Sequence, residues 1–423
     1  MSSSILNCMV SMSVIVASGC LFYFYVVLPQ QEAQGQQRPN IIVIMADDLG
    51  WNDVSFHGAD QIPTPNIDAL AYNGVILQRH YVLPICTPSR TAFLTGRYPI
   101  RTGMQGYPLK AGEERAIPLS NTLLPEYLRK LGYATHLVGK WHVGYYSDYH
   151  TPAHRGFDTF LGYYNGYITY FNHTIEQNLK FTLFDGGIRG AACVYSPAIK
   201  NPSRISNQLI HVTDWLPTFY SAAGGNLEDL EENLDGVDQW ATIVSEKKTR
   251  RKNVLLNIDE KQGLSGALMG RYKLINGANL SYGDYYGDSG TSESYPEYNV
   301  SNVLHSAAGS ALASVSNATL NSERIIELRR AATVVCNNFT SYPRCLDRCL
   351  FDVYNDPCET TDVSREHPEV VDELNRFISG YFTVLKTQTS GLVDPRSYPE
   401  HFNGTWMPWI KLPDDEIRLL SGR

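Results

Sequence analysis

Charged residues are sparse in this chain of 423 residues, at 18% of the sequence, whereas hydrophobic residues make up 43%. That composition excludes an intrinsically disordered or low-complexity protein and leaves enough apolar side chains for a sizeable core. Basic residues are outnumbered 35 to 43 by acidic residues, which gives a net charge of -8. The chain therefore has no general attraction for nucleic acid or anionic membranes. A site for an anion would need basic residues concentrated locally.

Basic residues are absent from the N-terminal 28 residues, which end in an apolar run over residues 5–28. This run is longer than the roughly 7–15-residue core of an ordinary signal peptide and approaches the roughly 20 residues that span a bilayer. Without a preceding Lys or Arg, the positive-inside rule gives little orientation. Ala33 and Gly35 offer a small-residue cleavage site. We expect residues 1–35 to be a signal peptide or a signal anchor, so that the bulk of the chain is lumenal or extracellular.

Six N-x-S/T sequons follow this segment, at Asn172, Asn279, Asn299, Asn317, Asn338 and Asn403. Any single sequon arises easily by chance. Six of them after a signal-like segment favour real glycosylation of several.

Four of the eight cysteines lie close together, at Cys336, Cys345, Cys349 and Cys358. In an oxidising compartment this cluster predicts two disulfides, whose pairing stays open. A zinc site is the alternative, but no His stands at ligand spacing within the cluster.

The first half of the chain alternates strand-like and helix-like segments. Residues 40–45 form an apolar, β-branched run that predicts a buried parallel strand, with Asp47 and Asp48 at its carboxyl end. Ligand sites in open α/β sheets lie at that end of the strands. Helices are expected over 66–77, 120–131 and 211–223, and a strand over 133–139. This order indicates a doubly wound α/β domain.

The pattern changes after residue 247. Short strands are expected over 253–258, 271–275 and 349–354, a long loop region over 277–322, and an amphipathic helix over 366–385. We therefore expect a smaller α+β domain over residues 248–423, after a main domain over residues 38–247.

The segment richest in chemistry is Pro84-Ile-Cys-Thr-Pro-Ser-Arg90-Thr-Ala-Phe-Leu-Thr-Gly-Arg97. Here Cys86 precedes a Pro-Ser-Arg turn and a helical stretch. A helix N-terminus favours anions, and Arg90 adds a fixed positive charge one turn later. An isolated Cys is more often structural, but this spacing favours a reactive residue.

This segment resembles the signature of the sulfatase family. A second signature matches at Gly132-Tyr-Ala-Thr-His-Leu-Val-Gly-Lys140-Trp-His142, and a third at Ala46-Asp47-Asp48-Leu49-Gly50. The sequence pattern from Pro39 onward is most similar to the arylsulfatase B type within the family. The resemblance implies an alkaline-phosphatase-like doubly wound sheet, with the smaller C-terminal domain beside it.

The resemblance also implies a sulfuric ester hydrolase that acts on a sulfated glycan or an aryl sulfate. Cys86 would be oxidised to formylglycine by a formylglycine-generating enzyme, and its hydrate would attack sulfur. A Ca²⁺ ion would be bound by Asp47, Asp48 and the modified Cys86. Arg90 would hold the modified residue, and Lys140 and His142 would bind the sulfate. Lys180, before Gly186-Gly187, fits the family's further sulfate-binding Lys, although the residues upstream match poorly.

The match breaks between Tyr170 and Lys180. Relatives carry a long stretch there, with a His that acts as general acid and an Asp-Asn pair that completes the metal site. Ca²⁺ takes about six to eight oxygen ligands, so two carboxylates predict weak binding. A central strand and its flanking helices would be missing too, which would expose apolar sheet edges. We interpret the chain as a splice variant or an incomplete reading of a sulfatase gene that need not be active.

Two alternatives stay open. The first is a non-catalytic lumenal relative that binds sulfated glycans without turnover. The second is another hydrolase of the superfamily, such as a phosphatase, which a Cys at the nucleophile position argues against. The destination within the secretory pathway also stays open between lysosomal, secreted and membrane-anchored forms, and so does the natural substrate.

Overall fold

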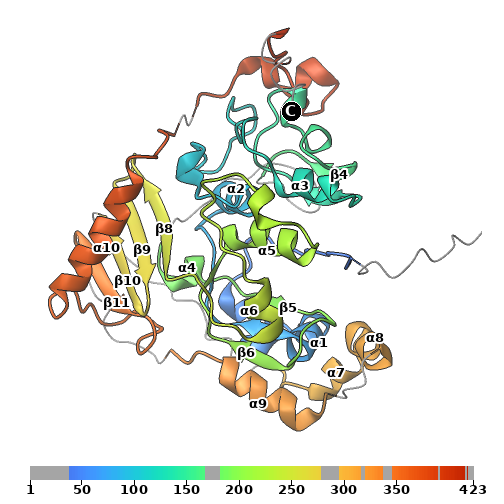
Figure 1. Cartoon of the computed structure of the whole chain (residues 1–423), viewed down its shortest axis with the longest axis vertical. Coiled ribbons are helices and arrows are strands. Elements are labelled where there is room, and N and C mark those ends of the chain that lie inside the picture. The colour runs from blue at the N-terminus through green and yellow to red at the C-terminus, as the bar shows by residue number, and fades with distance from the viewer. Residues whose placement is uncertain are drawn as a thin grey trace, which may run out of the picture. The chain divides into compact units, whose positions relative to one another are not determined.

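A computed structural model describes residues 38–166, 182–277, 295–315, 320–336, 345–388, 391–414 and 417 (Figure 1). Its first part contains α1 Pro65–Asn73, β1 Val75–Leu77, β2 His80–Tyr81, α2 Cys86–Thr95, α3 Leu124–Lys130, β3 His136–Lys140 and β4 Thr159–Tyr163. Next come α4 Asp185–Ile188, β5 Cys193–Val194, β6 Arg204–Ser206, β7 Ile210–His211, α5 Trp215–Ala222 and α6 Trp240–Ser245. The last part holds β8 Asn253–Asp259, β9 Leu264–Met269, β10 Tyr272–Asn276, α7 Val300–Leu304, α8 Ala307–Val315, α9 Ser322–Ala332, β11 Arg348–Asp352 and α10 Pro368–Tyr381.

Short parallel pairings characterise the part before residue 247. β2 pairs with β7, β3 pairs with β4, and β1 pairs with β6, all in parallel, while β5 joins β1 in antiparallel orientation. Parallel pairing of strands far apart in sequence is the arrangement expected of an α/β domain.

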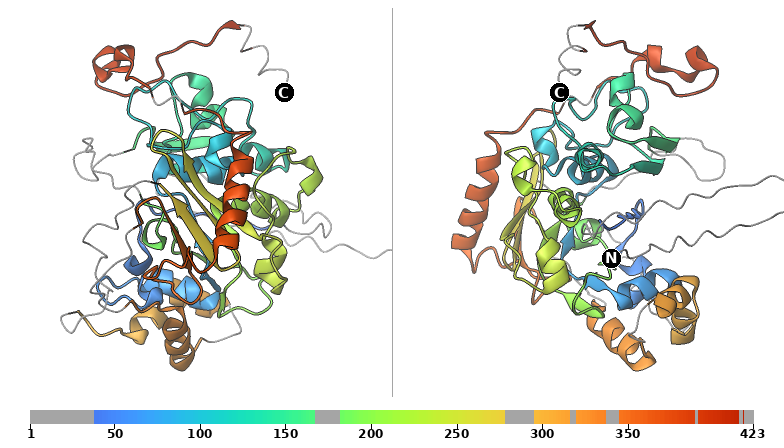
Figure 2. Two further views of the ribbon diagram at one scale, coloured as in Figure 1. Left: turned by 90° about the vertical axis from the view of Figure 1, so that its left-hand side faces the viewer. Right: turned by 45° about the vertical axis from the view of Figure 1, so that its right-hand side comes forward.

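The four-stranded antiparallel sheet, in the order β11-β10-β9-β8, is a separate unit of structure. Figures 1 and 2 both show α10 lying along one face of this sheet. α10 begins with Pro368 in its first turn and turns Val371, Leu374 and Ile378 inward. That spacing places three apolar side chains on one helical face, which explains why the helix docks there.

Both faces of this sheet are covered. Along β8, Leu255 and Ile258 join the cluster that contains α10, whereas Val254 and Leu256 join a cluster with Phe184 and Ile188. Alternate residues of a strand point to opposite faces, so β8 is apolar on both sides. Each fully buried side chain of this size contributes about 1.5–3 kcal/mol.

The expected strand over residues 40–45 is wrong. The segment carries no strand, and Ile42 and Ile44 are each 85% exposed. An apolar β-branched run becomes a buried strand when a partner strand satisfies its backbone. Within the described residues no strand pairs with it.

Several predicted ends are also wrong. The helix expected over 66–77 ends at Asn73, because Gly74 interrupts it and Val75, Ile76 and Leu77 form β1. The helix expected from Ser120 begins at Leu124, where the Glu126 carboxylate accepts a hydrogen bond from the Leu123 amide. The helix expected over 211–223 begins as the 3₁₀ turn Val212–Asp214 before α5.

The C-terminal predictions are closer to the structure. β8, β10, β11 and α10 lie within a few residues of the expected strands and helix. The loop region expected over 277–322 is partly wrong, because it contains α7 and α8. The boundary between domains at residues 247 and 248 stays a prediction.

Candidate functional site

Cys86 is the first residue of α2. Ile85 before it is extended, with φ -148° and ψ 170°, so the chain enters the helix abruptly at the cysteine. The Ser89 hydroxyl donates to the Leu83 carbonyl at 2.8 Å and fixes this entry. The helix packs against the 3₁₀ turn Val212–Asp214, α3 and α5. The thiol therefore stands in the positive field of a firmly held helix N-terminus.

Asp47 links two cations beside Cys86. Its Oδ2 accepts from Lys140 Nζ at 2.6 Å, and its Oδ1 accepts from Arg90 Nη2 at 3.2 Å. Arg90 also donates to the Lys140 carbonyl at 2.9 Å. The three sequence motifs identified above therefore meet at one place, although they lie up to 93 residues apart.

Burial and charge act in opposite directions on the two ionisable groups at this place. Burial tends to raise the pKa of Asp47, but Lys140 and Arg90 outweigh it and hold that pKa below its ordinary value. Burial raises the pKa of the Cys86 thiol, although the Lys140 ammonium opposes the shift. In this setting Asp47 is ionised at neutral pH and Cys86 is a thiol.

His142 lies in a left-handed conformation with φ 56° and is almost fully buried. Its Nε2 contacts the Leu109 carbonyl at 2.8 Å, and because a carbonyl only accepts, Nε2 carries the proton. Burial, reinforced by Lys140, lowers the pKa of His142 to about 3. Thr87 Oγ1 donates to the His142 carbonyl at 3.0 Å and connects it to the first turn of α2. His142 is therefore a neutral imidazole fixed close to the Cys86 end of the helix.

The described residues do not assemble a calcium site. They contain no group of three or more His, Cys, Asp or Glu side chains placed to hold a metal ion. Both carboxylate oxygens of Asp47 already accept from cations, and Asp48 is exposed with φ 59°. These two residues and Cys86 stay a prediction as metal ligands, and no chemical step is derived through a metal.

Other predicted positions have mixed outcomes. Lys180 lies outside the described residues, as do the sequons at Asn172, Asn279, Asn317 and Asn338. Asn299 and Asn403 are exposed, as a glycosylation site requires. The apolar N-terminal run also lies outside the description, and among the described residues no helix is long and apolar enough to cross a membrane.

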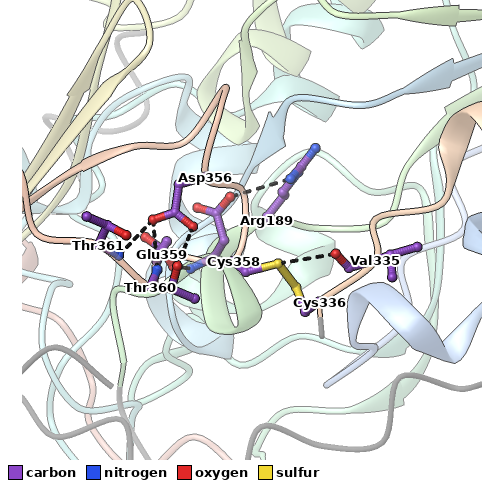
Figure 3. The surroundings of a disulfide bond; sticks show 9 residues. Arg189, Val335, Cys336, Asp356, Cys358, Glu359, Thr360 and Thr361 are labelled. Atoms are coloured by element: carbon purple, nitrogen blue, oxygen red, sulfur yellow. Dashed lines mark hydrogen bonds and ion pairs between the residues drawn. A yellow bond between two sulfur atoms is a disulfide. The ribbon is translucent and has the colours of Figure 1, made fainter. Parts of the chain in front are cut away.

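The predicted pair of disulfides is confirmed, as Cys336–Cys358 and Cys345–Cys349. Figure 3 shows the first of these next to Glu359. Cys86 and Cys193 carry free thiols.

The sequence patterns did not predict a buried cluster of charged side chains at the start of α4. Lys273 in β10, fully buried, pairs with Asp185 at 2.7 Å and with Glu359. Glu359 Oε2 also accepts from the Asp185 amide at 2.6 Å. Burial raises the pKa of Glu359, opposed by Lys273. Lys273 and Glu359 are 86 positions apart in different elements, and nothing in the local sequence pattern marks them as partners.

Comparison with known proteins gives this arrangement a context. A family model described as Sulfatase matches residues 39–180. Arylsulfatase J of Mus musculus is 27% identical over 520 residues, an alignment that covers 90% of this chain and 82% of that protein. Steryl-sulfatase of Homo sapiens is 43% identical over 144 residues, covering 31% of this chain and 25% of that protein. N-acetylgalactosamine-6-sulfatase of Rattus norvegicus is 38% identical over 157 residues, covering 35% of this chain and 29% of that protein.

Solved structures with the same fold include Ps i-CgsB in complex with k-i-k-neocarrahexaose, with a TM-score of 0.60 and 18% identity over 87% of this chain and 97% of that one. The PsFucS1 sulfatase from Pseudoalteromonas sp. has a TM-score of 0.58 and 17% identity, over 85% of this chain and 92% of that one. The expected alkaline-phosphatase-like α/β fold with a smaller sheet domain is confirmed. The family model and the curated relatives support the sulfatase family, and the solved structures show the fold, whereas a special closeness to arylsulfatase B is not shown.

The alignment with arylsulfatase J also bears on the internal segment that is predicted to be missing between Tyr170 and Lys180. At 520 residues it is longer than this entire chain of 423. The relative therefore has stretches that this chain lacks. This agrees with a missing internal segment.

Proposed function

We propose that this chain, as a protein of the sulfatase type, hydrolyses sulfate esters of glycans with Cys86 as the precursor of its nucleophile. The observation that carries the proposal is the meeting of Cys86, Asp47, Arg90 and Lys140 at the N-terminus of α2. They come from three separate motifs, with Cys86 and Arg90 in the same one, and the convergence of the three motifs is what a shared site requires.

The cations give this site its preference for an anion. Lys140 and Arg90 lie on either side of Asp47, so two buried or half-buried positive groups face one carboxylate. The helix N-terminus adds a further positive field. A sulfate ester carries one negative charge, and Lys140 beside the Cys86 thiol is placed to bind it.

Cys86 fits the oxidised form that the family uses. Its side chain is mostly buried, stands next to the Lys140 ammonium and begins a helix. Oxidised to formylglycine, it would supply a hydroxyl of the aldehyde hydrate as a nucleophile toward sulfur. Lys140 and Arg90 would orient the ester, and the neutral His142 would hold the Leu109 loop against the site.

The choice of a sulfated glycan as substrate is supported by the relatives. The relatives include an N-acetylgalactosamine-6-sulfatase, and one solved structure of the same fold is a complex with k-i-k-neocarrahexaose. The two disulfides fit an oxidising compartment, which agrees with a secretory destination.

A second candidate function is binding of sulfated glycans without turnover. The observation that favours it is the engagement of Asp47 by two cations, together with the lack of a metal-holding group among the described residues. In this alternative the cations bind sulfate, and the ester is not cleaved.

Mass spectrometry and a turnover assay separate the two. The chain is secreted from cells that contain the formylglycine-generating enzyme, and the tryptic peptide His80–Arg90 is analysed for the mass loss that marks formylglycine. Hydrolysis of an aryl sulfate and of sulfated disaccharides is compared with the Cys86→Ala variant. Modification with turnover above the variant supports the hydrolase. Modification without turnover supports the binding function, and an unmodified Cys86 without turnover overturns the hydrolase.

A further inference from the structure

Residues 247–252 connect α6 to β8 (Figure 1). They carry a concentration of exposed basic side chains. The sequence is Lys-Lys-Thr-Arg-Arg-Lys, and Lys247, Lys248, Arg250 and Lys252 are all exposed. We call these four residues the basic strip. None of them forms an ion pair within the described part of the chain, although the protein as a whole is acidic at -8.

The backbone of the strip is fixed by the residues that alternate with its cations. The Thr249 amide donates to Gln208 Oε1 at 3.0 Å, and its hydroxyl donates to Gln239 Oε1 at 2.8 Å. Arg251 points inward and donates to Asp214 at 2.7 Å and to the Asp235 carbonyl at 2.7 Å. Thr249 and Arg251 therefore anchor the backbone of the segment that carries the four exposed cations.

The surroundings of the strip add positive charge, and the one carboxylate next to it in sequence already has other partners. Lys200 is exposed, and its amide donates to the Val244 carbonyl near the end of α6. Glu246 lies immediately before the strip. Its Oε1 accepts a hydrogen bond from Asn201 Nδ2 at 2.5 Å, and its Oε2 lies 4.0 Å from Arg204 Nε. At the other end, Arg79 donates to the Gly270 carbonyl, and the Gly270 amide donates to the Lys252 carbonyl. Lys200 and Arg79 therefore add positive charge near the strip, and the Glu246 carboxylate beside it already has two other partners.

Four unpaired cations on a fixed backbone cost free energy through mutual repulsion and gain it when a polyanion covers them. Exposed lysines scattered singly need no such explanation. Because the backbone that carries these cations is already fixed, it loses little freedom on binding, and several neighbouring cations suit an extended anionic chain better than a single small anion.

We propose that the basic strip binds the anionic groups of a sulfated glycan chain, outside the Cys86 site. The choice of a sulfated glycan over other polyanions rests on the proposed function, whereas the polyanion site itself does not. Arg251 ties the strip to Asp214, whose 3₁₀ turn packs against α2. The strip and the helix of Cys86 therefore belong to one packed frame, and a bound glycan would be held by the same body that carries the site.

The test compares three forms of the chain, all on a Cys86→Ala background so that turnover plays no part. In the first, the strip is intact. In the second, Lys247, Lys248, Arg250 and Lys252 are changed to Gln. In the third, a matched set of exposed cations elsewhere, Lys130, Arg330, Lys386 and Lys411, is changed to Gln, which alters net charge by the same amount.

Binding to immobilised chondroitin sulfate is measured at low and physiological salt, with desulfated chondroitin, duplex DNA and anionic phospholipid vesicles as comparison ligands. We expect the strip variant to bind chondroitin sulfate at least about tenfold more weakly, and the intact form to lose affinity as salt rises. We expect the control set to change affinity by less than about threefold. Unfolding midpoints check that all forms are folded.

Equal loss in the strip and control variants would overturn the site, since net charge alone would then explain binding. Strip-dependent binding that is equal or stronger for DNA or for vesicles would overturn the choice of partner. Because Cys86 is absent from every form, a failure of catalysis in the earlier assay leaves these outcomes unaffected.

Discussion

The Asp47 side chain bridges two cations, because one of its carboxylate oxygens accepts a hydrogen bond from Lys140 and the other accepts one from Arg90. The Lys140 side chain is 6% exposed and that of Arg90 is 12% exposed. Two cations held this close in a partly dry environment repel each other unless a carboxylate lies between them. Asp47 therefore stabilises the site whether or not it ever binds a metal.

We predict that Asp47→Asn lowers the free energy of unfolding by about 1–3 kcal/mol, the usual effect of losing hydrogen bonds to charged groups. Urea denaturation measures this. Asp48→Asn is the matched control, because Asp48 is exposed and its left-handed backbone accommodates Asn. It should change stability by less than about 0.5 kcal/mol. Equal effects of both substitutions would show that the bridge contributes nothing.

The motifs predicted which side chains gather at the site but not how they interact. Cys86, Arg90 and Lys140 were expected together, and the structure places them together. The two contacts of Asp47 could not be inferred, because a carboxylate beside a strand suits a metal as well as a cation. The Leu109 partner of His142 lies 33 residues away and belongs to no motif.

At the scale of secondary-structure elements, two apolar surfaces lack cover among the described residues. One is the 42–45 segment, and the other is the β3–β4 pair, where Val138 is 78% exposed and Leu161 is 74% exposed. A two-stranded parallel pair with exposed apolar residues is unusual, since parallel sheets are normally buried on both faces. The internal gap that the sequence predicts would account for this exposure, because the elements predicted to be absent would cover these surfaces.

We predict that Ile42→Thr together with Ile44→Thr reduces aggregation and the binding of a hydrophobic dye without lowering the unfolding midpoint. Both side chains are 85% exposed, so little buried area is lost. Light scattering and dye fluorescence provide the measurements. Ile41→Thr is the matched control, because Ile41 packs against the cluster of α3 and α5. It should lower the midpoint, and a comparable loss in the double variant would contradict the exposure of 42–45.

Sequence patterns located elements well where local signals decide the outcome. The apolar face of Val371, Leu374 and Ile378 predicts α10, and apolar runs bounded by turns predict β8, β10 and β11, whereas β9 was not predicted. The 40–45 strand failed for a non-local reason: its pattern was strand-like, but a strand needs a partner that the described residues do not supply. An apolar, β-branched pattern indicates that a segment can be buried as a strand, but it does not indicate whether a partner strand is present.

At the scale of the whole molecule, Lys273, Asp185 and Glu359 join α4, the antiparallel sheet and the segment after the Cys336–Cys358 disulfide. Tyr81 also donates to Asp185 at 3.2 Å, so β2 of the α/β part takes part. A buried ion cluster adds little to stability as a whole but is costly to break on one side. This cluster therefore fixes how parts distant in sequence are arranged.

We predict that Lys273→Met lowers the free energy of unfolding by about 3–5 kcal/mol, because Asp185 and Glu359 then lose the buried ammonium that pairs with both, and Arg189, 3.6 Å from Asp185, does not replace it. Adding Asp185→Asn and Glu359→Gln to that variant should recover part of the loss, since the unpaired charges are removed. Denaturant unfolding of the single and triple variants provides the measurement. A triple variant less stable than Lys273→Met would contradict a charge-based role.

Five buried histidines make the molecule sensitive to acid, at His57, His80, His142, His150 and His211. In each case burial lowers the pKa, so the folded chain keeps the imidazole neutral while the unfolded chain takes up a proton. His57 illustrates the sign, because burial lowers its pKa from 6.5 to about 3. Its contribution to stability is complete above pH 6.5 and is lost progressively as the pH falls toward 3.

We predict that His57→Phe flattens the decline of stability between pH 6 and 4 by about 1.4 kcal/mol per pH unit, one proton's share of the linkage. Phe keeps the ring that stacks on Trp51 at 3.6 Å but cannot be protonated. Stability curves at several pH values test this, with His401→Phe at an exposed position as the control. An unchanged slope would show that His57 is already protonated in the folded state. If the slope flattens as expected, the native structure loses free energy in the acidic range because its interior excludes charge, whatever the site at Cys86 does.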